Sequence, residues 1–251
     1  GTGLALTVLA EVIAGGSGRF FPGMGWPWER GAGTLGNPNV AGAYLAAVFP
    51  ILHALPGPPW VRWPLGGIIL AALIGTGSRG GWTAAFMGTV WFMRRQRSPY
   101  LPWVVTVVFL ALLLPSPVGR RFWAGFLLCD STAKARLTVW REAMGLFLRR
   151  PSAGWGMAAP LGWAAHPHSL FLEILLTGGL WAAAGFLPLG IRLARLLFGR
   201  SAIRVETASG ASLVSLLVFG LGDAVLTTPV LAALFWLTVG LVLPRRAEEE
   251  P

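Results

Sequence analysis

Residues 169–190, SLFLEILLTGGLWAAAGFLPLG, form a nearly continuous apolar stretch whose single charged residue is Glu173. A helix that crosses a membrane needs about 20 predominantly apolar residues, and this stretch supplies them. The whole chain of 251 residues is 55% hydrophobic and 12% charged, whereas a soluble domain carries about 25% charged residues. The composition therefore predicts an all-α integral membrane protein rather than a soluble domain.

Further apolar runs, bounded by proline, glycine and arginine, predict a polytopic bundle of about eight membrane segments in a single domain over residues 1–251. The segments are expected at 2–14, 40–55, 64–78, 81–93, 100–114, 169–190, 208–226 and 229–243. The pair 64–78 and 81–93 allows two interpretations, a tight hairpin or one long helix with Arg79 at membrane depth. Because the chain opens inside an apolar run without a charged leader, we expect an N-terminally truncated protein.

Arginines between the apolar runs indicate the orientation, because cytoplasmic loops carry an excess of basic residues. With eight crossings, three arginine-bearing connections and the arginines after the last segment fall on the same side, which we expect to be cytoplasmic. These arginines are Arg62, Arg94, Arg95, Arg97, Arg192, Arg195, Arg200, Arg204, Arg245 and Arg246. The tail at 245–251 is predicted to be disordered.

The long stretch 115–168 falls on the opposite side and is unusually basic. Asp130 and Glu142 are outnumbered there by seven basic residues: Arg120, Arg121, Lys134, Arg136, Arg141, Arg149 and Arg150. A guanidinium group fits two phosphate oxygens at once, so the excess suggests an anionic ligand. Nucleic acid is not expected as a partner, because no basic stripe lies on a soluble face.

Within this stretch, residues 132–149 are predicted to form an amphipathic helix with Arg136 beside its apolar face. Ser131 or Thr132 would cap its N-terminus, and Pro151 would end it. The apolar face recurs at three- and four-residue spacing: Leu137, Trp140, Met144 and Phe147.

Arg79 lies in the sequence TGSRGG, between two apolar runs. A charge at that depth is unfavourable unless it is paired or hydrated, which makes Arg79 a candidate functional residue. The small residues around it would let a large head group approach the backbone. The alternative is a simple hairpin turn with one solvated arginine.

His166 and His168 flank Pro167 where the long stretch enters the next apolar run. Histidine is the side chain best suited to take up a proton near neutral pH. No HExxH or GxSxG motif accompanies the pair, so no metal site or activated nucleophile is predicted. Glu173 and Asp223 could orient a histidine or pair with an arginine, or could act only as a helix cap or an interfacial ion pair.

Four segments resemble the O-antigen ligase family in their sequence, order and spacing. They are GTLGNPNVAGAYLAAVFP (33–50), TGSRGG (76–81), ARLTVWREAMGLFLRRPSAGWG (135–156) and AHPHSLFLEILLTGGL (165–180). The resemblance extends from about Gly33 to about Leu243. This family shares a superfamily with O-antigen polymerases and bacterial protein O-oligosaccharyltransferases.

The resemblance implies a multi-pass protein of the bacterial inner membrane with a periplasmic active site. It implies transfer of a glycan from an undecaprenyl diphosphate carrier to an acceptor such as the lipid A core, another glycan or a protein hydroxyl. Such a transfer would invert the anomeric centre and would need neither a metal nor another cofactor.

The family's residue roles carry over to particular positions of this chain. His168 would be the catalytic base, while Arg79 and Arg136 would bind the diphosphate, with Arg141 as an alternative to Arg136. The chain departs from the family at Ser169, where asparagine is usual. His166, Ser169, Glu173 and Asp223 would support the site.

A hypothesis of another class is a transporter of lipid-linked glycans that carries out no chemistry. Many helices and a basic cavity would suit an anionic lipid. Transporters often contain two matching sets of interrupted helices, however, and the sequence shows no such pair. Loss of transfer on removal of the His168 side chain would distinguish an enzyme from a transporter.

Overall fold

The computed structural model describes residues 1–14, 30–54, 57–113, 116–157, 159–162, 164, 166–198 and 204–243. Within these residues the chain is helical and contains no strand. The helices are α1 (Thr2–Ile13), the 3₁₀ turn η1 (Gly33–Leu35), α2 (Pro38–Ala54), α3 (Pro59–Gly75), α4 (Arg79–Arg95), α5 (Leu101–Leu113), α6 (Pro117–Phe126), α7 (Ser131–Arg149), α8 (Leu170–Phe198), α9 (Arg204–Gly220) and α10 (Pro229–Val242). The all-α class is therefore confirmed.

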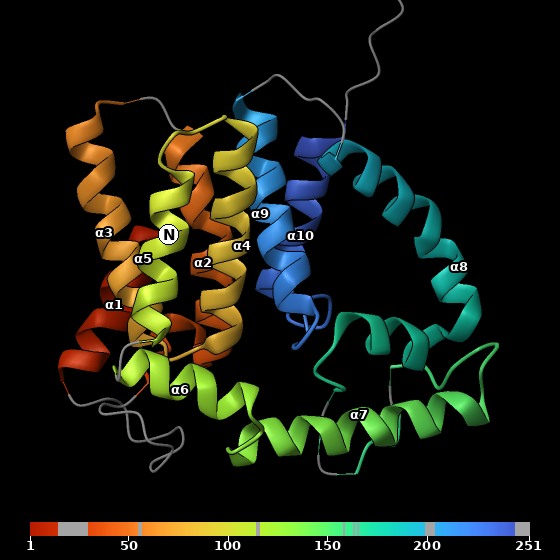
Figure 1. The fold of residues 1–251 in the computed structure, drawn as a ribbon. Helices are drawn as coiled ribbons and strands as arrows, with labels where there is room; N and C mark the ends of the chain where they lie inside the picture. Colours follow the sequence, from red (N-terminus) through yellow and green to blue (C-terminus); the bar gives the residue numbers. More distant parts are fainter. Residues whose placement is uncertain are drawn as a thin grey trace, which may run out of the picture.

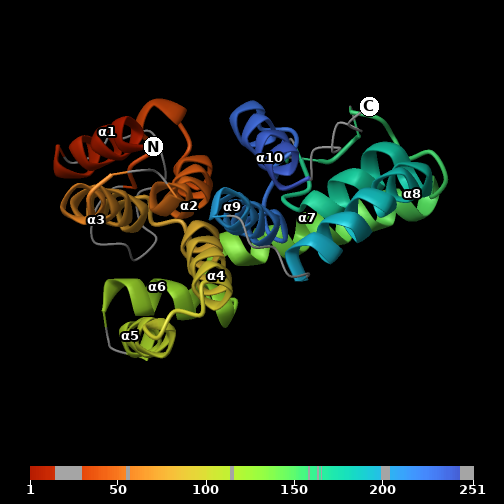
Figure 2. The ribbon, with the colours of Figure 1, turned by 90° about the horizontal axis from the view of Figure 1, so that it is seen from above.

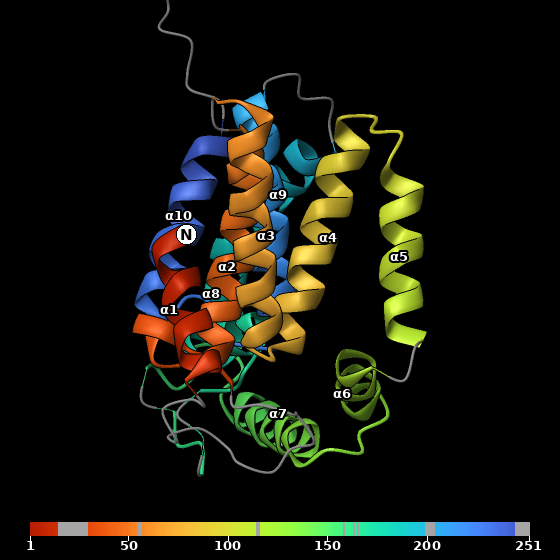
Figure 3. The same ribbon diagram turned by 90° about the vertical axis from the view of Figure 1, so that its left-hand side faces the viewer.

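The helices form an upright bundle with a crossbar at one end (Figure 1). Helices α2, α3, α4, α5, α9 and α10 run roughly parallel or antiparallel to one another, while α6 and α7 lie across their lower ends (Figures 1 and 3). One helix of the described residues, α8, is both long and apolar enough to cross a membrane. Six others are apolar but only 10–17 residues long.

Each of the eight predicted apolar segments contains a helix, but several boundaries differ. Helices α3 and α4 are separate, joined by a turn at 76–78, so the hairpin interpretation of this pair is correct. Helix α9 ends at Gly220, earlier than predicted, and this places Asp223 in the turn before α10. Helix α8 continues to Phe198 and is broken at Gly179, whose φ of 62° is available to glycine at little strain. The predicted tail at 245–251 lies outside the described residues.

Three helices, α2, α4 and α9, form the centre of the bundle (Figure 2). Small residues let their backbones approach closely. A Cβ on Gly81 of α4 would lie 2.9 Å from the carbonyl carbon of Gly42 in α2. On the other side, Ser212 of α9 donates a hydrogen bond of 2.5 Å to the carbonyl of Ala47. This packing brings the start of α2, the start of α4 and the end of α9 to the same end of the bundle.

The predicted amphipathic helix is present as α7, but its cap and its buried face differ from the prediction. Asp130, not Ser131 or Thr132, caps the helix by accepting a hydrogen bond of 2.7 Å from the amide of Ala133. The buried face consists of Val139, Ala143 and Leu146, whereas Met144 is 40% exposed. The face is rotated because Ala143 and Leu146 pack against Leu161 and Leu176 from the segments that follow α7.

Candidate functional site

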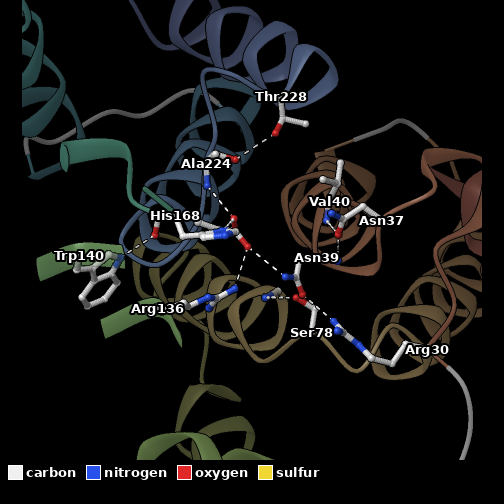
Figure 4. Close-up of polar contacts among 12 residues, drawn as sticks. Arg30, Asn37, Asn39, Val40, Ser78, Arg136, Trp140, His168, Ala224 and Thr228 are labelled. Atoms are coloured by element: carbon white, nitrogen blue, oxygen red, sulfur yellow. Dashed lines mark hydrogen bonds and ion pairs between the residues drawn. The ribbon is translucent and has the colours of Figure 1, made fainter. Parts of the chain in front are cut away.

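The candidate site lies at the end of the bundle that α7 crosses. Four segments distant in sequence meet there: the start of α2, the turn between α3 and α4, the loop before α8, and the turn between α9 and α10 (Figure 4). Most of the polar side chains singled out from the sequence lie in these segments.

Asp223 is the centre of the site. Its Oδ1 lies 2.9 Å from His168 Nδ1, and its Oδ2 accepts hydrogen bonds of 2.9 Å from Arg136 and 3.2 Å from Asn39. Burial alone would raise the pKa of this carboxyl, but the hydrogen bond with His168 and the charge of Arg136 outweigh it and hold the pKa below its usual value. Asp223 is therefore ionised at neutral pH and accepts hydrogen bonds only.

Arg136 and Trp140 reach the site from the same helix, α7. Residues four apart lie on the same face of a helix. From that face of α7, Arg136 reaches Asp223, and Trp140 donates its indole N–H to the carbonyl of His168 at 3.3 Å (Figure 4). One helix face thus holds the carboxylate and the backbone of the histidine together.

His168 is held in a conformation suited to a base. Because an ionised Asp223 can only accept, the proton of the neutral imidazole lies on Nδ1, and the lone pair of Nε2 is left for a substrate. The backbone of His168 has a φ of 49°, in the left-handed region that non-glycine residues rarely adopt and that is common at active sites.

His166 packs against the ring of His168, with 4.3 Å between the ring centroids and an angle of 73° between the planes. Its Nδ1 is buried and has no hydrogen-bond partner among the described residues. Burial, and secondarily the neighbouring His168, lower the pKa of the His166 imidazole. His166 is therefore neutral at neutral pH and acts here as packing for His168.

Arg79 lies at the first position of α4, where Ser78 caps the helix by accepting from the amide of Gly81. Its guanidinium forms an ion pair with Asp130, the residue that caps α7. Burial alone would raise the pKa of the Asp130 carboxyl, but the hydrogen bond from Arg79 and the bond from the Ala133 amide lower it. The ion pair thus joins the start of α4 to the start of α7.

Two further arginines hold the turn between α3 and α4. Arg30 Nε donates to the carbonyl of Thr76, and Arg121 Nε donates to the carbonyl of Gly77, both at 2.8 Å. Gly77 has a φ of 58°, and a Cβ there would lie 3.2 Å from Arg30 Nε and 3.4 Å from Arg121 Nε. Glycine is needed at this position for both its backbone conformation and its small size.

The structure brings some of the expected residues together and separates others. Arg136, His166, His168 and Asp223 are in mutual contact or hydrogen-bonded, and Arg79 lies at the same end of the bundle. Arg141 is exposed on α7 and makes no hydrogen bond or ion pair with the described residues, so the geometry favours Arg136 as the arginine at the site.

Ser169 and Glu173 are both buried beside the site at the start of α8. Neither carboxyl oxygen of Glu173 has a hydrogen-bond partner among the described residues. Among the described residues, Glu173 therefore makes no bond to a histidine or an arginine.

The nitrogen and carboxylate atoms of His166, His168 and Asp223 lie within 4.8 Å of one another, which is close enough to consider a metal ion. The chemistry of the donors does not favour one. Both oxygens of Asp223 already accept hydrogen bonds, and the guanidinium of Arg136, 2.9 Å away, would repel a cation at the carboxylate.

Sequence reasoning missed four residues of this site: Arg30, Asn39, Arg121 and Asp130. Asn39 has no predicted role in the sequence, yet its side-chain amide joins Arg30 to Asp223. Their partners lie up to 184 positions away along the chain, so no local spacing could reveal them. The one available signal was the density of arginine in the loops on this side.

Residues 65–187 match the family model described as O-Antigen ligase. This match supports the assignment of the chain to the O-antigen ligase family. The family's members are membrane-embedded enzymes of the glycosyltransferase type. The match contains Arg79, Arg136 and His168 but ends before Asp223, and it covers a shorter range than the resemblance seen in the sequence. No curated protein matches the chain.

Proposed function

We propose that this member of the O-antigen ligase family transfers a glycan from a polyprenyl diphosphate, expected to be undecaprenyl diphosphate, to an acceptor hydroxyl. The observation that carries the proposal is the assembly of His168, Asp223 and Arg136, in which one carboxylate lies 2.9 Å from both a histidine and an arginine. Arg79 lies at the same end of the bundle. A base and cationic groups are the two requirements of this reaction.

His168 would act as the base toward the acceptor. With its Nδ1 proton directed at Asp223, Nε2 can take the proton of the acceptor hydroxyl as that oxygen attacks the anomeric carbon. Asp223 would stabilise the imidazolium that forms. A single in-line displacement would invert the anomeric centre.

The arginines would act on the leaving group. The bond between the anomeric carbon and the phosphate oxygen breaks, and its electron pair leaves on the polyprenyl diphosphate. Guanidinium groups fixed beside that oxygen stabilise the negative charge as it develops, and losing one such contact commonly lowers the rate by about 10²–10³. Arg136 and Arg79 would fill this role without a metal ion.

Exposed apolar side chains on the outer helices indicate how the protein would lie in a membrane. Large apolar residues are exposed on α3, α5, α8 and α10, including Trp63, Trp103, Val107, Trp181 and Leu237. We propose that lipid covers these surfaces and that the helices form a polytopic bundle in the bacterial inner membrane. The candidate site and its basic loop at 115–168 would then face the periplasm, and the arginine-rich ends would face the cytoplasm.

The acceptor we propose first is the lipid A core or a similar glycan. A polysaccharide polymerase or a protein O-glycosyltransferase would use the same donor site and the same base with a different acceptor. A transporter of lipid-linked glycans would need the basic cluster but not a histidine with a free Nε2.

Replacing His168 by alanine tests the enzymatic proposal. We expect His168→Ala to lower transfer by about 10²–10⁴-fold because the base is lost, while the affinity for the polyprenyl diphosphate stays within a factor of about two of the wild type, since the phosphate ligands are intact. Transfer is measured as glycan released from a radiolabelled lipid-linked donor, and binding is measured separately.

Lys134→Ala is the matched control, because Lys134 is exposed on α7 and its side chain makes no hydrogen bond or ion pair with the described residues. It should leave transfer unchanged. Normal movement or transfer of the donor in the His168 variant would refute the enzymatic proposal and favour a transporter.

A further inference from the structure

Arg30 lies inside the candidate site, but its hydrogen bonds with the described residues go only to neutral oxygens. Its Nε donates to the carbonyl of Thr76 at 2.8 Å, and its Nη2 donates to the side-chain oxygen of Asn39 at 2.7 Å (Figure 4). Nη1 makes no hydrogen bond with any described residue. The guanidinium is therefore fixed along one edge, and its remaining N–H groups are available to a ligand.

The two carboxylates of the cluster are already paired with other arginines. Asp130 pairs with Arg79, and Asp223 pairs with Arg136. Burial, followed by the charges of Arg121, Arg79 and Arg136, lowers the pKa of the Arg30 guanidinium to about 9. Among the described residues, Arg30, Arg79 and Arg136 are three guanidiniums near two carboxylates, so the site has a surplus of positive charge, which is unfavourable in a partly buried site without an anion.

The diphosphate of a polyprenyl-linked glycan has the opposite charge. Each of its two phosphates carries one negative charge, so the pair would neutralise the surplus. One phosphate is accounted for by Arg79 and Arg136 in the proposed function. The other requires a donor group at the same end of the bundle, and the free edge of Arg30 offers one.

We propose that Arg30 binds the donor's diphosphate as a third guanidinium ligand, held in place by the carbonyl of Thr76 and by Asn39. This inference rests on the proposed function, since it names a further ligand of the same donor. Asn39 has two tasks in it. Its oxygen accepts from Arg30, and its NH₂ group donates to Asp223 at 3.2 Å. Asn39 thereby fixes the position of Arg30 relative to the carboxylate that holds His168.

Binding of two soluble probes to the full chain in detergent tests the inference. The probes are farnesyl diphosphate and farnesyl monophosphate. We expect Arg30→Gln to weaken diphosphate binding by about 10- to 100-fold, which corresponds to the loss of hydrogen bonds to a charged group. Monophosphate binding should change by less than about threefold, because the other phosphate keeps its own arginines. Arg30→Lys should bind the diphosphate with an affinity between those of the wild type and Arg30→Gln, since lysine keeps the charge but loses the planar fork.

Arg120→Gln is the matched control, because Arg120 is an exposed arginine one position from Arg121. It should bind both probes as the wild type does. The thermal midpoint of each unliganded variant is recorded as a second measurement. A purely structural Arg30 would give a lower midpoint with unchanged diphosphate affinity, and that result would overturn the inference. An equal loss of monophosphate and diphosphate binding would also overturn it.

The outcome can be separated from a failure of the proposed function. Arg79→Gln and Arg136→Gln serve as references that must lose diphosphate binding if the donor is a polyprenyl diphosphate. If they lose binding and Arg30→Gln does not, the role of Arg30 is refuted and the proposed function stands. If the wild type binds neither probe, both proposals fall.

Discussion

At the scale of single residues, Asp223 connects the proposed base, His168, to Arg136 and Asn39. One oxygen orients the base, and the other accepts from Arg136 and Asn39. A carboxylate can do both because it has several lone pairs and no proton to donate. The low pKa of Asp223 keeps it in that form at neutral pH.

Replacing Asp223 by asparagine should therefore impair catalysis more than folding. We expect Asp223→Asn to lower the turnover number by about 10²–10⁴-fold, because an asparagine can present a donor to His168 and allow the wrong tautomer. The measurement is single-turnover transfer at saturating donor.

Glu142→Gln is the control for the Asp223 variant. Glu142 lies on α7 and accepts a hydrogen bond of 2.8 Å from the amide of Gly162, and glutamine keeps an acceptor there. Its turnover should match the wild type. A turnover number in Asp223→Asn equal to that of this control would show that the carboxylate is not needed to orient His168.

At the scale of elements, α7 is the helix that assembles the site. Its first turn is capped by Asp130, which also pairs with Arg79 of α4. Its buried face then places Arg136 against Asp223 and Trp140 against the His168 carbonyl. A single element thus joins the start of α4, the loop before α8 and the turn after α9.

Two substitutions of Asp130 separate its roles as a helix cap and as a charged partner. Asparagine caps a helix about as well as aspartate, whereas alanine does not. We expect Asp130→Ala to lower the free energy of unfolding by about 1 kcal/mol more than Asp130→Asn does. Both variants lose the pairing with Arg79, so the difference reports the cap. Unfolding in a detergent titration measures it, and equal values for the two variants would contradict the role of Asp130 as the cap.

At the scale of the whole molecule, the proposed orientation puts α6, α7 and the site on the periplasmic side. Cys129, the single cysteine of the chain, is exposed between α6 and α7. Gln96 is exposed and directly follows α4, whose last turn lies at the end of the bundle opposite α6 and α7 (Figure 1). These two positions report the two sides of the membrane.

A membrane-impermeant maleimide should therefore label Cys129 in intact spheroplasts. In a Cys129→Ser background, Gln96→Cys should be labelled only after the membrane is permeabilised, because the arginine-rich ends are expected to face the cytoplasm. Labelling is measured by the mass shift of the purified protein. The reverse pattern would invert the proposed topology, and labelling of both positions in intact cells would argue against a membrane between them.

The sequence predicted those features that depend on residues close together along the chain. Apolar runs predicted the helices, because burial from water or in lipid depends on composition along a few turns. The periodicity of residues 132–149 predicted an amphipathic helix with Arg136 beside its apolar face. The His-Pro-His segment marked the loop before α8. Each of these inferences depends on residues within one element or one turn.

The rotation of α7 and the ends of α8 and α9 could not be obtained in this way. Met144 has the right spacing for a buried residue, but the packing partners Leu161 and Leu176 select the neighbouring face with Ala143. The end of α9 at Gly220 likewise reflects the turn toward α10 rather than a change in hydrophobicity.

By itself, the sequence determined that this protein is helical and that its loops carry an excess of arginine, and it predicted roles for His168, Arg79 and Arg136. Only the tertiary structure decided that Asp223 joins His168 to Arg136, that Asp130 engages Arg79, and that Asn39 carries Arg30 into the same cluster. The physical reason is that hydrogen bonds and ion pairs act over about 3 Å in space. The residues that make them here are separated by as many as 184 positions along the chain.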